Sequence, residues 1–62
     1  MSYRVKIAIV PGALPRPHTR DYIESTERLR VDDKAIAEII RRDAQAHLGT
    51  LYATVTVEEV TP

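Results

Sequence analysis

The sequence predicts a small α+β domain, in which a two- or three-stranded sheet carries one amphipathic helix on one face and homodimerisation completes the fold. Two segments near the chain ends have the periodicity of strands, and a long helical segment precedes the second of them. The chain has 62 residues and no cysteine, so its core is small and has no disulfide bond to stabilise it. Because single cores rarely suffice below roughly 70–80 residues, we expect one domain over residues 1–62 that forms a two-fold dimer.

The first strand is predicted from the alternation in YRVKIAIV, residues 3–10. A period of two with β-branched residues is typical of a strand that buries one side. The larger apolar side chains share one face: Tyr3, Val5, Ile7 and Ile9. Pro11 and Gly12 are expected to end this strand.

The segment PGALPRPHTR, residues 11–20, is expected to be a stiff loop, because its prolines favour extended backbone. A short strand near residues 26–31 is expected next, since Glu27 to Val31 alternate in polarity. A helix is the alternative for residues 21–31, although Ser25 and Thr26 are poor residues for a helix interior.

The clearest element is a helix in DDKAIAEIIRRDAQAHLG, residues 32–49. Asp32 or Asp33 can cap its first turn, and Gly49 suits the left-handed backbone that often follows a helix. At about 100° per residue, one face gathers Ile36, Ile39, Ile40 and Ala44. We expect this face to pack against the sheet.

The last strand is predicted from TLYATVTVEEV, residues 50–60, which alternates in the same way as the first. The face towards the helix is expected to hold Leu51, Ala53, Val55 and Val57. The uncovered face is expected to hold Tyr52, Thr54, Thr56 and Glu58. The helix would then cover one side of the sheet and leave the other side to solvent or to a partner.

Composition narrows the classes of function. Nine basic and nine acidic side chains give a formal net charge of zero, which argues against a protein that mainly binds nucleic acid non-specifically. The N-terminal apolar run is too short for a signal peptide and nothing approaches a membrane span, so we expect a cytoplasmic protein. With glycine only at positions 12 and 49, there is no phosphate-binding glycine-rich loop. We expect no catalytic residues, no metal and no cofactor.

The proline loop is the first candidate site, as an arm that contacts a partner subunit. Its residues in that role are Leu14, Pro15, Arg16, Pro17, His18 and Arg20. A ligand loop is an alternative, because Arg16, His18 and Arg20 can donate hydrogen bonds to a phosphate or carboxylate. A further alternative is a passive connector whose prolines lower the entropy lost on folding.

A second candidate is the pair Asp43 and His47, which are neighbours at i and i+4 within the apolar stripe of the helix. A carboxylate beside an imidazole at a subunit interface would make assembly sensitive to pH near the histidine pKa of about 6.5. The alternative is that the stripe leaves the core near its end and the pair meets solvent.

The third candidate is a basic sheet face formed by Arg4, Lys6, Arg28, Arg30 and Tyr52. Arginines for phosphates and one aromatic ring for stacking could bind single-stranded nucleic acid. The alternative is a solvated face whose charges prevent aggregation. Taken together, the sequence predicts a non-enzymatic, homo-oligomeric interaction or regulatory module that binds a protein partner. A nucleic-acid-binding regulatory protein is the alternative.

Overall fold

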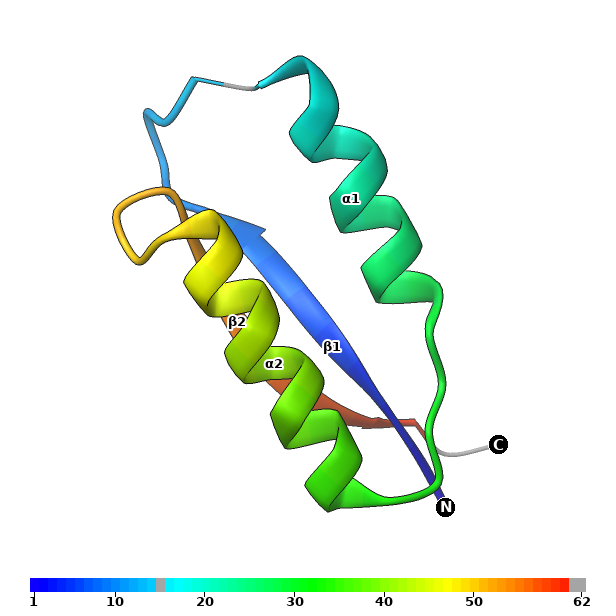
Figure 1. Ribbon diagram of the computed structural model, residues 1–62. Coiled ribbons are helices and arrows are strands. Elements are labelled where there is room, and N and C mark those ends of the chain that lie inside the picture. Colours follow the sequence, from blue (N-terminus) through cyan, green and yellow to red (C-terminus); the bar gives the residue numbers. More distant parts are fainter. Residues whose placement is uncertain (15, 61–62) are drawn as a thin grey trace.

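The computed structural model describes residues 1–14 and 16–60, in the order β1–α1–α2–β2 (Figure 1). The element bounds are Ser2–Ile9 for β1, Pro17–Arg28 for α1, Lys34–Leu48 for α2 and Ala53–Val60 for β2. The strands pair antiparallel in a two-stranded sheet, and both helices lie over the same face of it. The α+β class is therefore confirmed, but the prediction of a single helix is wrong. No helix in these two described ranges is long and apolar enough to cross a membrane.

The pairing register sorts the strand residues into an inner and an outer face. Val5 lies opposite Val57 and Ile7 lies opposite Val55, and this face is covered by the helices. Arg4 lies opposite Glu58 on the uncovered face. Over β1 and β2 the predicted alternation is confirmed by this register, because side chains along a strand point to opposite faces in turn. Leu51 was expected on the covered face, but it lies before β2 and is 93% exposed.

Helix α1 occupies the segment where a short strand near residues 26–31 was predicted, so that prediction is wrong. Pro17 stands at the start of the helix, where its missing N–H is not needed. The buried Thr26 lies one turn after the half-buried Tyr22, so both side chains are on the side of the helix that faces the sheet. The hydroxyl of Ser25 is satisfied within the helix, because it donates to the carbonyl of Asp21 at 2.6 Å.

Only one residue pair remains of the predicted third strand. The N–H of Tyr3 donates to the carbonyl of Val31 at 2.7 Å, and the N–H of Val31 donates to the carbonyl of Tyr3 at 3.0 Å. Val31 lies between α1 and α2 in the chain, and its isolated bridge to Tyr3 covers the start of the outer edge of β1.

The proline loop is shorter than predicted, because Pro17 to Arg20 belong to α1. Its first part is a tight turn in which the N–H of Ala13 donates to the carbonyl of Val10 at 3.0 Å. Pro11 and Gly12 fill the central positions, and the φ of +88° at Gly12 is the value that a type II turn requires there. Pro15 lies outside the described residues.

Helix α2 begins and ends as predicted but faces the sheet with different residues. Asp33 caps it by accepting a hydrogen bond from the N–H of Ala35 at 2.8 Å, and Gly49 follows its last turn with a φ of +83°. The buried residues of α2 are Ala37, Ala44 and Leu48. The predicted packing of Ile36 and Ile39 against the sheet is wrong, because both are exposed. The alanines bring the helix close to the strands and turn these isoleucines away.

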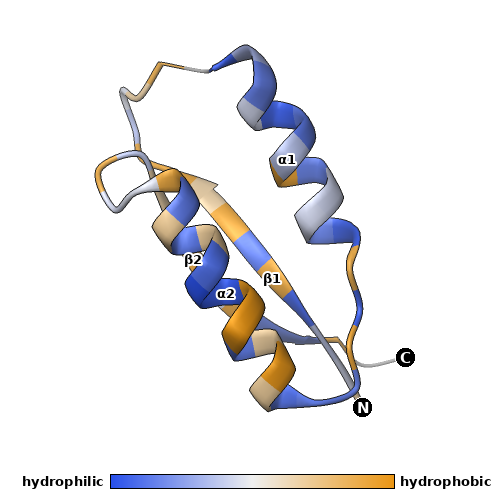
Figure 2. Ribbon diagram, viewed as in Figure 1, coloured by the Kyte–Doolittle hydropathy of each residue, from blue (hydrophilic) through white to orange (hydrophobic). Residues whose placement is uncertain are grey.

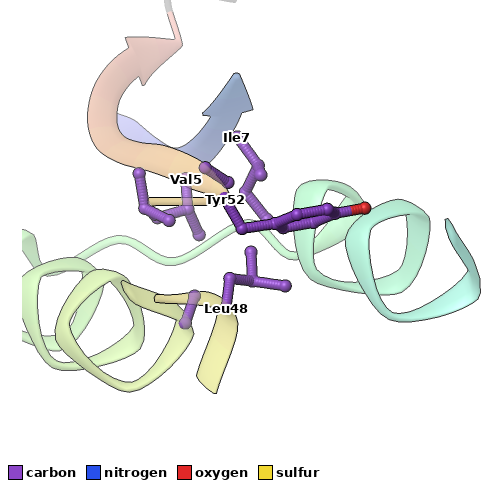
Figure 3. Close-up of a cluster of buried hydrophobic side chains, with 7 residues drawn as sticks. Val5, Ile7, Leu48 and Tyr52 are labelled. Atoms are coloured by element: carbon purple, nitrogen blue, oxygen red, sulfur yellow. The ribbon is translucent and has the colours of Figure 1, made fainter. Parts of the chain in front are cut away.

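The core lies between the sheet and the helices and is built around small side chains. Its buried cluster consists of Val5, Ile7, Ala44, Leu48, Tyr52, Ala53 and Val55. Tyr52 was expected on the uncovered face, but only 7% of it is exposed. Strand β2 begins one residue later, so strand alternation does not decide where Tyr52 points. Figure 3 shows its ring beside Ile7 and Leu48, with the hydroxyl end directed towards α1.

Side chains of the helices form hydrogen bonds with both outer edges of the sheet. The N–H of Ile7 in β1 donates to Glu27 Oε2 of α1 at 2.9 Å. On β2, Gln45 Nε2 donates to the carbonyl of Ala53 at 2.9 Å, and the N–H of Val55 donates to Gln45 Oε1 at 3.0 Å. The amide of Gln45 thus pairs with β2 in the way that a neighbouring strand would.

Replacing Gln45 by alanine should lower the free energy of unfolding by about 1–3 kcal/mol, because two edge groups lose their partner. Urea denaturation followed by circular dichroism measures this loss. Glu38→Ala is the matched control on the same helix, since it removes only a partly exposed ion pair with Arg41, worth about 0.2–1 kcal/mol. Equal losses in the two variants would show that Gln45 does not hold the edge.

Candidate functional site

The residues predicted as an interaction arm fall into two structural groups. Leu14 is an exposed loop residue, whereas Pro17, His18 and Arg20 lie in the first turns of α1. Arg16 stands between the groups as the residue that precedes the helix, and its side chain does not cap it. The structure therefore presents Pro17, His18 and Arg20 from the end of a helix, whereas Leu14 lies in the loop before it.

Arg16 packs over the ring of Tyr52. Its guanidinium carbon lies 4.5 Å from the ring centroid, within the range of a cation–π interaction. Tyr52 is fixed by the core beneath it, so this contact anchors the end of the proline loop to the start of β2. The sequence prediction placed these two residues in separate candidate sites, and the fold brings them together.

A hollow of about 260 Å³ lies beside this contact. Its lining residues are Ile9, Arg16, Arg20, Ile23, Glu24 and Tyr52. Apolar groups from β1, α1 and the start of β2 thus meet two guanidinium groups and one carboxylate. A second, more open hollow of about 530 Å³ shares Arg16 and Tyr52 with the first and extends towards the loop at Gly49 to Leu51.

Asp43 and His47 are both exposed on α2, and within the described ranges no hydrogen bond or salt bridge joins them. His47 instead packs against Tyr22 of α1, with ring centroids 4.4 Å apart and the rings tilted by 32°. This stacking contact joins the two helices above the sheet. A pH-sensitive role for the pair stays a prediction.

The predicted basic face is not assembled. Arg4 forms an ion pair with Glu58 at 3.1 Å, directly across the sheet. Arg28 ends α1, and Arg30 follows it and donates to the carbonyl of Glu27 at 2.8 Å. Neither belongs to the sheet, because Arg28 lies in α1 and Arg30 lies in the link between α1 and α2. With Tyr52 buried, the outer sheet face keeps Lys6 and a neutralised Arg4.

An exposed apolar side of α2 is the feature that the sequence analysis missed. Ile36 and Ile39 are exposed by 47% and 59%, and Figure 2 shows that hydrophobic residues are frequent in the first half of α2. We call these two residues the α2 patch. The sequence does contain a signal for this exposed side, because Ala37, Ala44 and Leu48 form a second apolar stripe on the same helix.

Over residues 1–14 and 16–60, no cluster of three or more histidine, aspartate or glutamate side chains is arranged to hold a metal ion. Comparison of the chain with protein-family models, curated proteins and solved structures finds no match.

Arg16→Ala should lower the free energy of unfolding by about 0.5–1 kcal/mol through loss of the contact with Tyr52. The same change in a Tyr52→Leu background should cost almost nothing, since leucine keeps an apolar group in the core but has no ring. A double-mutant cycle by urea denaturation isolates the interaction. An equal cost of Arg16→Ala in both backgrounds would contradict the cation–π contact.

Proposed function

We propose that the protein is a small, non-enzymatic interaction module that self-associates through the α2 patch and, as an oligomer, binds a protein partner. The observation that supports this most is the exposure of Ile36 and Ile39 on a helix whose other face already covers the core. Burying aliphatic side chains contributes about 25 cal/mol for each Å² removed from water, so pairing these surfaces is favourable.

The surface area of the chain supports an oligomer. The chain exposes 4596 Å², whereas a compact monomer of 7.0 kDa is expected to expose about 4,000 Å². The excess is close to the share of one partner in the smallest stable interfaces, about 500–600 Å².

The edges of the sheet are less suited to self-association. Val31 and Glu27 already bond to backbone groups of β1, and Gln45 bonds to the first half of β2. The remaining part of β2 carries Glu58 and Glu59. Two copies paired along this part would bring like charges together, which opposes edge-to-edge association.

The outer sheet face offers less to either kind of partner. Its residues are polar or charged over most of both strands, and Arg4 is neutralised by Glu58. Phosphate binding depends on cationic side chains that are free to displace counterions, and here Lys6 alone extends from the centre of this face. Nucleic-acid binding therefore ranks second as a proposal. Cytoplasmic residence stays a prediction.

Ile39→Glu should reduce the oligomer to a monomer of 7.0 kDa, because a carboxylate would be buried in an apolar contact. The fold should survive, since Ile39 is mostly exposed and glutamate is a good helix former. Size-exclusion chromatography with light scattering gives the mass, and circular dichroism reports the fold.

Leu51→Glu is the matched control, because Leu51 is an aliphatic residue that is 93% exposed but lies in the loop before β2. Its oligomeric mass should equal that of the unchanged protein. A monomeric unchanged protein, or dissociation by Leu51→Glu and not by Ile39→Glu, would reject the α2 patch. The ratio of absorbance at 260 and 280 nm in the same run shows whether nucleic acid is bound.

A further inference from the structure

We propose that the hollow beside Tyr52 binds a small monocarboxylate with an apolar body. The carboxylate would meet the guanidinium groups of Arg16 and Arg20, and the body would contact Ile9, Ile23 and the Tyr52 ring. This binding site is separate from the α2 patch and does not depend on self-association.

The charges around the hollow favour one negative group on the ligand. Arg16 and Arg20 both line it, and neither forms an ion pair with a carboxylate elsewhere in the described chain. Guanidinium groups bind carboxylates through paired hydrogen bonds of suitable geometry. Glu24 lines the same hollow, so its walls carry a net charge near +1 and favour a monoanion over a polyanion.

Arg16 is held in place before a ligand arrives. Its guanidinium rests 4.5 Å from the centroid of a ring that the core immobilises. A donor that is already positioned loses less conformational entropy on binding, which strengthens the complex. The guanidinium carries five N–H donors, and a carboxylate in the hollow can accept from those that face it.

The size and lining of the hollow limit the rest of the ligand. Its volume of about 260 Å³ is below the roughly 300–1,000 Å³ that is usual for drug-sized ligands. Ile9 of β1, Ile23 of α1 and Tyr52 of the turn before β2 supply its apolar walls. The space fits a branched aliphatic group or one ring, which could belong to a free acid or to the C-terminal residue of a peptide.

The test uses 4-methylpentanoate as the probe and 4-methylpentanamide as its uncharged match. Titration followed by NMR chemical shifts of the Tyr52 ring should show saturable binding of the acid and much weaker binding of the amide. Arg20→Gln should weaken binding of the acid by about tenfold, because a charge-assisted hydrogen bond is lost. Arg42→Gln, an exposed arginine on α2, should leave binding unchanged.

The source of the carboxylate is tested with acetyl-glycyl-leucine beside the free acid. Tighter binding of the peptide would assign the site to a peptide C-terminus, and equal or weaker binding would assign it to a free acid. Equal binding of the acid and the amide, no loss in a folded Arg20→Gln variant, or no saturable binding of either probe would overturn the proposal. The same titration is done with the Ile39→Glu variant. Because this variant lacks the α2 patch, its result tests carboxylate binding independently of self-association.

Discussion

A two-stranded sheet leaves a row of unpaired backbone groups along each of its outer edges, and this constraint shapes the whole molecule. Such a sheet is only marginally stable alone. Here α1 supplies Glu27 to one edge and α2 supplies Gln45 to the other, while both helices cover the same face. Each helix therefore contributes to the core and also ends the sheet laterally, so the sheet does not need further strands.

The sequence was most informative where a periodic pattern met a clear end signal. Both strands and α2 follow from alternation or helical spacing bounded by Pro11, Asp33 and Gly49. Helix α1 was missed because its inward side carries Thr26 and Tyr22 beside a single isoleucine, Ile23, which is a weaker apolar pattern than that of α2. Two apolar stripes on α2 made the larger isoleucines look like the core, although close packing against the strands selected the alanines.

The candidate site was less predictable than the fold, because it depends on where elements begin. Because β2 begins at Ala53 and not at residue 50, Tyr52 lies in the turn before the strand, where its ring is in the core and under Arg16. The start of α1 at Pro17 places Arg16 and Arg20 one helical turn apart, and both side chains line the hollow beside Tyr52. Periodicity gives the type of an element but not its first residue, so these contacts required the structure.

The two strands are the first and last elements of the chain, and Ser2 pairs with Val60. Forming the sheet therefore closes a loop that contains both helices, at an entropic cost that rises with the logarithm of loop length. Contacts between such distant segments slow folding relative to local ones. During synthesis, β1 emerges before β2 and has no strand partner until β2 is made. Formation of the sheet thus waits for β2.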